Sequence, residues 1–272
     1  MRTERTSQMA HGVARALVII LVFALVGTPA RSTVEVTSEL AGQESGSAIL
    51  RIALRDTIAP VDSTYFNVIA QTLDKKYKKW WAVVDLDSSG GNIQAALEIG
   101  AILRERGLAA LVDRGASCMS ACVYVLAGAP TRIVNQRAII GIHRPYDPND
   151  TADTAAQQRQ KQDDLGKRIV AFLQTMSVPT RLYEDSVFIA PDRMKILTPT
   201  EIATYGLDAN DPSVDEANEV REAKSLGISR LELGRRKADA RRRCGMDRLN
   251  DDTPFAELRK AALCEEKYVK GK

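Results

Sequence analysis

The chain has 272 residues with 38 Lys and Arg, 35 Asp and Glu, and a formal net charge of +3. Hydrophobic residues make up 44% and charged residues 27% of it, which excludes disorder throughout and is ordinary for a globular protein. The length allows one well-buried domain with an appendage and argues against a second large core.

The first 30 residues have the pattern of an export signal. Three arginines precede an uninterrupted apolar run at 16–26, and small residues follow at 28–30. The run is too short for a membrane span, which needs about 20 residues. We therefore predict a signal peptide over 1–30 and an exported, periplasmic protein, with an uncleaved N-terminal anchor as the alternative. Export and the lack of interleaved aromatics argue against nucleic acid as a partner.

Strand and helix patterns alternate over the rest of the chain. The expected strands are 47–55, 81–86, 108–112 and 138–142, and the expected helices are 62–79, 93–107, 120–127, 151–176 and 179–188. Another helix begins at Thr198, with Pro199 at its first position and Glu201 three residues after the cap. Alternating strands and helices favour a parallel sheet with right-handed crossovers, so we predict an α/β domain over 31–210.

Residues 211–272 are expected to form a charged helical C-terminal extension, because no convincing strand pattern occurs there. From 221 to 272 the chain carries 15 Lys and Arg but only 9 Asp and Glu, and six of the nine residues at 235–243 are basic. A solvated helix face is the favoured interpretation, and contact with an anionic membrane surface is the alternative.

Four cysteines are an even number for an exported chain, where disulfides persist. Cys244 and Cys264 are spaced to join two helical segments. Cys118 and Cys122 would be too strained for a disulfide on a single helix, so a bonded pair and two buried thiols stay equally open. Without a nearby His, Asp or Glu, they do not indicate a zinc site, and no metal or cofactor is expected.

Three loops should meet at one edge of the predicted sheet. Gly90 and Gly91 follow the strand 81–86, Ser120 follows the strand 108–112, and His143 follows the strand 138–142. The carboxyl ends of parallel strands lie together, and ligands of open α/β sheets gather there.

The residue types at this edge suit acyl transfer. A neutral serine hydroxyl is a poor nucleophile, and an imidazole is its commonest activator. His143 is the single histidine outside the predicted signal. The amide of Ala121 can stabilise an oxyanion at the helix start, and Gly91 lets a second amide approach because it has no Cβ.

Five segments together resemble the Clp protease and crotonase superfamily, specifically exported Clp-like serine hydrolases. They are DSSGG at 87–91, GASCMSA at 115–121 with AGA at 127–129, IGIHRP at 140–145, LTPTE at 197–201 and YGL at 205–207. The resemblance implies a spiral of ββα units, Ser120 as nucleophile and His143 as base. Two departures are Ser89 in place of the usual proline and the cysteines beside the nucleophile.

The resemblance also implies an aspartate shortly before the LTPTE helix. Asp192 is the nearest candidate, although the expected register falls on Met194. Asp147 and Asp208 are the alternatives.

The leading hypothesis is an exported serine peptidase that acts on peptides or unfolded segments through Ser120, His143 and Asp192, with Gly90, Gly91 and Ala121 around the oxyanion. A catalytically silent Clp-like binding module is the second hypothesis. Crotonase-type chemistry on acyl-coenzyme A is a weaker third, because such substrates are cytoplasmic. Assembly into a homo-oligomer stays open.

Overall fold

The computed structural model describes residues 34–41, 47–146, 154–249, 253 and 255–271. The predicted signal or anchor over 1–30, and with it His11, lies outside the described residues, and so does Asp147. Within the described ranges, no helix combines the length and the apolar character that crossing a membrane requires.

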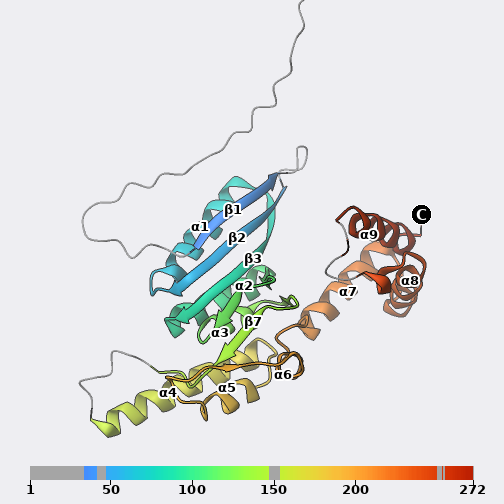
Figure 1. Cartoon of the computed structure of the whole chain (residues 1–272). Coiled ribbons are helices and arrows are strands. Elements are labelled where there is room, and N and C mark those ends of the chain that lie inside the picture. The colour runs from blue at the N-terminus through green and yellow to red at the C-terminus, as the bar shows by residue number, and fades with distance from the viewer. Residues whose placement is uncertain (1–33, 42–46, 147–153, 250–252, 254, 272) are drawn as a thin grey trace, which may run out of the picture. The chain divides into compact units, whose positions relative to one another are not determined.

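The sheet is mostly parallel and forks at its longest strand (Figure 1). Its strands are β1 (Val34–Ala41), β2 (Ser47–Ile58), β3 (Lys79–Gly91), β4 (Ala109–Val112), β5 (Ser117–Met119), β6 (Thr131–Val134), β7 (Ile139–Ile142) and β8 (Lys195–Ile196). The main path runs β1-β2-β3-β5-β7-β8, and β4 and β6 form a branch from β3. The pairings β1–β2 and β7–β8 are antiparallel, and the others are parallel.

The fork explains how the chain builds its repeating unit. Residues 83–85 of β3 pair with β4, whereas Ser88, farther along the same strand, pairs with Cys118 of β5. The chain order contains two ββα units, β4-β5-α3 and β6-β7-α4. In each unit the first strand, β4 or β6, lies in the branch, and the second strand, β5 or β7, lies in the main path. The predicted α/β class with ββα units is therefore confirmed, although β1, β5, β6 and β8 were not predicted as strands.

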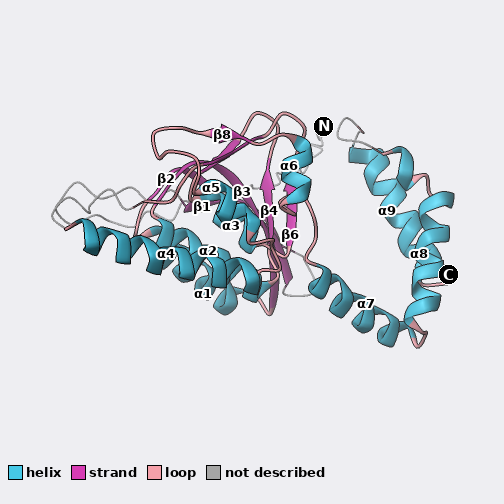
Figure 2. Ribbon diagram, turned by 90° about the horizontal axis from the view of Figure 1, so that it is seen from below, coloured by secondary structure: helices cyan, strands magenta, loops and turns pink. Residues whose placement is uncertain are grey.

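The helices of the first part of the chain cover one side of the sheet (Figure 2). They are α1 (Asp62–Lys76), α2 (Ile93–Arg106), α3 (Cys122–Gly128), α4 (Ala155–Thr175), α5 (Arg181–Ser186) and α6 (Pro199–Thr204). Asn92 caps α2 by accepting a hydrogen bond from the Ala95 amide, and Gly107 ends it in a left-handed conformation. Thr198 and Glu201 form the predicted capping box of α6.

Helices α2 and α3 touch backbone to backbone in the core. A Cβ added to Gly128 would lie 2.3 Å from the Cα of Gly100, so neither position has room for a side chain. The core to which both helices belong contains fully buried aliphatic and aromatic side chains from β2, β3, α1 and α2, among them Leu50, Ile52, Leu54, Phe66, Leu86, Ile99 and Leu103. Close packing of this kind fixes α3 firmly against the sheet.

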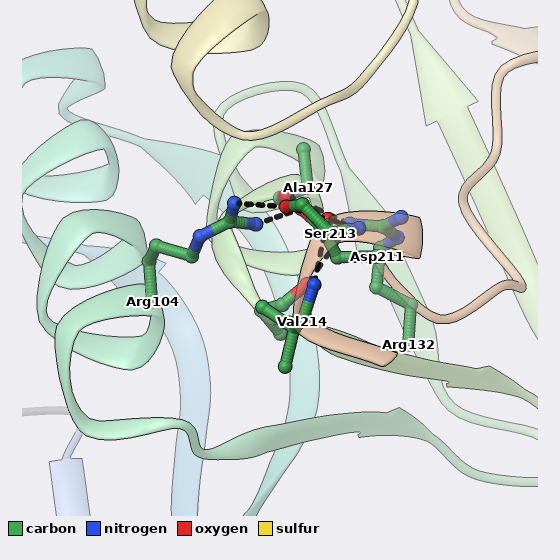
Figure 3. Close-up of polar contacts among 7 residues, drawn as sticks. Arg104, Ala127, Arg132, Asp211, Ser213 and Val214 are labelled. Atoms are coloured by element: carbon green, nitrogen blue, oxygen red, sulfur yellow. Dashed lines mark hydrogen bonds and ion pairs between the residues drawn. The ribbon is translucent and has the colours of Figure 1, made fainter. Parts of the chain in front are cut away.

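A buried ion pair attaches the last helices to α2 (Figure 3). The carboxylate of Asp211 is fully buried and accepts from the guanidinium of Arg104. It also caps α7 (Pro212–Leu226) by accepting from the amide of Ser213 at 2.8 Å. The amide of Asp211 donates to the carbonyl of Pro130 at 2.7 Å, just beyond the end of α3. Nearby, burial lowers the pKa of Arg132 to about 10.

The described residues beyond Asn210 form helices, in agreement with the sequence. Helices α8 (Arg230–Arg243) and α9 (Phe255–Val269) follow α7, and a disulfide joins Cys244 to Cys264 with Cα atoms 5.7 Å apart. Most basic side chains of α8 have acidic partners, in the pairs Arg230–Glu216, Arg236–Glu232, Lys237–Glu222 and Arg243–Asp239. This pairing is consistent with a solvated helix face.

Candidate active site

Four of the predicted site residues line one cleft of about 850 Å³. Gly90 and Gly91 reach it from the end of β3, Ser120 from the end of β5 and His143 from the end of β7. These strands are neighbours in the order β3-β5-β7, so their carboxyl ends meet as predicted. The strand that carries Ser120 is β5 rather than the predicted strand 108–112, which is β4 and belongs to the branch.

Ser120 is the first residue of a two-residue turn between β5 and α3. Its φ of +53° is left-handed, a conformation that costs a non-glycine residue about 1–2 kcal/mol. Its amide donates to the carbonyl of Gly141 at 2.8 Å, and its carbonyl accepts from the Val123 amide at 3.1 Å. The predicted helix over 120–127 therefore begins at Cys122, and the serine precedes it. The turn is held by both flanking elements.

A disulfide spans this turn. Cys118 lies on β5 and Cys122 begins α3, with Cα atoms 5.2 Å apart and both side chains fully buried. The strain expected from the four-residue spacing does not arise, because the two cysteines lie on different elements rather than on one helix. The bonded pair, one of the two open alternatives, is what the structure contains, and it fixes both ends of the segment that carries Ser120.

The diglycine packs directly against the serine turn. Gly90 has a φ of +93°, and a Cβ added there would lie 2.7 Å from the Cβ of Ser120 and 2.9 Å from the amide nitrogen of Ala121. Gly91 has a φ of +136°, and its Cβ would lie 2.4 Å from the carbonyl oxygen of Ile58. Both positions require glycine because neither the conformation nor the space admits a side chain.

The backbone amides of Gly90 and Ala121 differ in whether they already donate a hydrogen bond. The Gly90 amide donates to the hydroxyl of Ser88 at 3.1 Å. The Ala121 amide has no hydrogen-bond acceptor within the described ranges, as is usual in the first turn of a helix. The Ala121 amide is therefore an available donor beside Ser120, where an attacked carbonyl would develop negative charge.

His143 is half-buried, with one edge of its ring enclosed. Its Nδ1 atom is buried and has no hydrogen-bond partner among the residues that the structure describes. The ring of Tyr146 lies 5.9 Å away in a tilted arrangement. Because Nδ1 is enclosed and the side chain lines the cleft, Nε2 is the nitrogen available to a neighbouring hydroxyl. Burial lowers the pKa of the imidazole below 6.5, although an interaction with the backbone of Arg144 opposes part of this shift, so the ring is mainly neutral at pH 7.

Two of the carboxylates considered as a third member, Asp192 and Asp208, are described by the structure and lie outside the residues that line this cleft. Asp192 is exposed and makes no hydrogen bond or ion pair within the described part of the chain. Asp208 is also exposed, and its charge acts on Arg132 instead. The assignment of Asp192 stays a prediction.

Helix α4 forms a wall of the cleft that the sequence did not indicate. Its lining residues are Lys161, Gln162, Asp164, Leu165 and Arg168. Gln162 donates to the carbonyl of Pro145 at 2.8 Å, and Arg168 donates to the side chain of Gln94 at 2.8 Å. The apolar stripe of this helix was recognised, but its polar face gave no signal, because a polar face is the default for a surface helix.

Comparison with known proteins finds similar solved structures. No family model and no curated protein matches the chain. A serine-to-alanine variant of the 1510-N membrane-bound stomatin-specific protease is 18% identical, with 62% of this chain and 79% of that chain covered and a TM-score of 0.43. A lysine-to-alanine variant with a bound substrate peptide is 19% identical, with 61% and 74% covered and a TM-score of 0.44. The roles assigned to residues of this chain rest on its own geometry.

Proposed function

We propose that this protein is an exported serine hydrolase that cleaves peptides or unfolded segments by acyl transfer. The observation that carries the proposal is the left-handed turn at Ser120, which presents the serine in the same cleft as His143 and beside the Ala121 amide. A strained backbone at a hydroxyl that faces a cleft is typical of functional sites. The structural role of a helix cap does not account for it, because Ser120 makes no side-chain cap to α3.

The reaction follows from these positions. Nε2 of His143 takes the proton as the Ser120 hydroxyl attacks the scissile carbonyl, and the Ala121 amide holds the oxyanion, with Gly91 as a second donor. The imidazolium then protonates the leaving amine. Water hydrolyses the acyl-enzyme with His143 again as base, which restores the free hydroxyl. No cofactor enters this scheme.

Fluorophosphonate labelling of the full chain tests the proposal. The expected result is one covalent adduct, located on Ser120 by peptide mass spectrometry and absent from Ser120→Ala. The His143→Ala variant should label at least 100-fold more slowly, because the general base contributes about 100- to 10,000-fold. Absence of the adduct from the wild-type protein in every oligomeric state obtained would overturn it.

Export is tested separately. We expect the periplasmic fraction to contain a chain that begins at Arg31, as read by mass spectrometry of its N-terminus. An intact chain in the membrane fraction would support the anchor alternative, and an intact cytoplasmic chain would overturn export.

A silent binding module is the second candidate, favoured by the unpartnered Nδ1 of His143. In that case cells carrying Ser120→Ala would keep the function and cells lacking residues 221–272 would lose it. A contact of the extension with an anionic membrane surface would appear as co-sedimentation with anionic but not neutral vesicles. Self-assembly would appear in sedimentation velocity.

A further inference from the structure

We infer that Met194 occupies the position from which a carboxylate would orient the His143 ring, so that within the part of the chain that the structure describes Ser120 and His143 form a pair without a third member. This inference rests on the proposed function and concerns how the same site is built. A group at residue 194 would orient the ring of His143, and in this chain that group is the thioether of methionine.

The strand register places Met194 opposite His143. In the antiparallel pairing of β7 with β8, Gly141 faces Ile196 and Ile142 faces Lys195. Continuing the register by one pair sets His143 opposite Met194. Opposite residues of an antiparallel pair project to the same face, with Cβ atoms about 4.5–5.5 Å apart.

The contacts around Gly141 confirm on which face the thioether lies. Alternation along a strand puts residues 141 and 143 on one face. A Cβ built on Gly141 would lie 2.8 Å from the Sδ of Met194 and 2.4 Å from the Sδ of Met119. The side chain of Met194 therefore lies on the same face as the ring of His143, next to the residue that precedes Ser120.

The enclosed nitrogen of His143 supports the same assignment. Nδ1 is buried without a partner in the described part of the chain, whereas a neutral imidazole has one donor and one acceptor to satisfy. A thioether is only a weak acceptor and carries no charge. Asp192 lies two residues earlier, in the turn before β8. Both Asp192 and Met194 are exposed, Met194 by 40%, so the strand register and the position of the Met194 Sδ beside Gly141, rather than burial, favour residue 194.

Without an acceptor at Nδ1, His143 should be a less effective general base. To take a proton at Nε2, the ring must carry its proton on Nδ1, and that N–H would be enclosed with no acceptor placed for it among the described residues. In the serine protease triad, a change that favours the wrong tautomer lowers kcat by about 10,000-fold. The pair in this chain should therefore work well below the rate that a carboxylate at residue 194 would allow.

The test installs that carboxylate in the full chain. His11→Gln leaves His143 as the single imidazole, so its titration can be followed by NMR without assignment. In this background, Met194→Asp should raise the midpoint of the His143 titration above that of the unmodified site, because a nearby anion favours the imidazolium. The fluorophosphonate labelling rate should rise at least 10-fold. Met194→Asn, of the same shape without the charge, is the matched control and should reproduce neither change.

Two results would overturn the inference. One is a folded Met194→Asp protein whose titration midpoint and labelling rate both match those of Met194→Asn. The other is a loss of 10-fold or more in labelling on Asp192→Asn, which would make Asp192 the orienting carboxylate; this exposed substitution is informative even if Met194→Asp does not fold. The NMR titration reports whether residue 194 lies beside His143 even in a protein that does not label. A protein that shows the titration shift but no labelling would therefore contradict the proposed function and leave this inference standing.

Discussion

Replacing Gly90 by alanine should displace the nucleophile without removing any side chain. The new Cβ would lie 2.7 Å from the Cβ of Ser120, and an ordinary contact begins at 3.4 Å, so the two must separate by about 0.7 Å. The carbonyl oxygen of Met119, at 2.6 Å, and the amide nitrogen of Ala121, at 2.9 Å, are backbone atoms that cannot rotate away. A misplacement of about 1 Å can lower a rate about 100-fold, and we expect a loss of that size.

Gly107→Ala is the matched control. Gly107 also has a positive φ, +65°, but a Cβ there would meet nothing within 4 Å. Gly107→Ala costs only backbone strain of about 1 kcal/mol, which lowers Tm by about 2–4 °C in a chain of this size. Gly90→Ala adds the clash with backbone atoms to a similar strain, so its Tm should fall further. Only Gly90→Ala should also slow labelling.

The assay is the second-order rate of fluorophosphonate labelling at Ser120, with Tm measured on the same samples. If Gly90→Ala labels within threefold of the wild-type rate, the diglycine does not position the serine. Equal losses of labelling in both variants would show that the effect comes from general destabilisation, which would refute the reasoning as well.

Three further predictions concern the disulfide, the base and the buried ion pair. Removing the Cys118–Cys122 bond by a double alanine substitution should slow labelling at least 10-fold and lower the free energy of unfolding by about 2 kcal/mol, from closure of a short loop. Because burial lowers the pKa of His143 below 6.5, the labelling rate should fall with a midpoint below pH 6.5, and stability should decline over the same range, since the unfolded chain binds this proton more tightly. Asp211→Ala should cost about 3 kcal/mol in a urea titration, because it leaves the guanidinium of Arg104 partly buried without its partner.

Matched variants distinguish these effects from general instability. Replacing Cys244 and Cys264 removes a longer loop worth about 3 kcal/mol, but labelling at Ser120 should not change. Loss of labelling in that variant would contradict a local role for the first disulfide. Asp74→Ala removes a carboxylate that is 47% exposed, against 0% for Asp211, and that accepts from Arg106 and Trp80; it should cost about 1 kcal/mol, less than Asp211→Ala. A midpoint of labelling well above pH 6.5 would contradict the effect of burial on the base.

The local signals of the sequence predicted most helices well. Thr198 and Glu201 form the expected capping box, and Gly107 ends α2 where predicted. These features depend on hydrogen bonds within a few residues of each other, which a sequence pattern records directly. The presence of Ser120 and His143 in one cleft was also predictable, because it needs only parallel strands in one sheet.

The short strands could not be predicted for a physical reason. β5 has three residues and exists because Ser117, Cys118 and Met119 pair with residues 139–141 of β7. Nothing in three residues distinguishes such a strand from the turn that was predicted. β3 continues through the diglycine to Gly91 because it pairs with β2 along its whole length, although the glycines themselves favour a turn.

The left-handed backbone at Ser120 has the same origin. A serine in isolation would leave this conformation, since the strain exceeds thermal energy. It is retained because Gly141 accepts from its amide, Gly90 packs without a side chain against its Cβ, and the disulfide fixes residues on both sides. Each of these contacts acts between segments that the sequence shows only separately. If the proposed function is correct, removing any one of them should relax the turn and slow the reaction, even though none of the residues removed takes part in proton transfer.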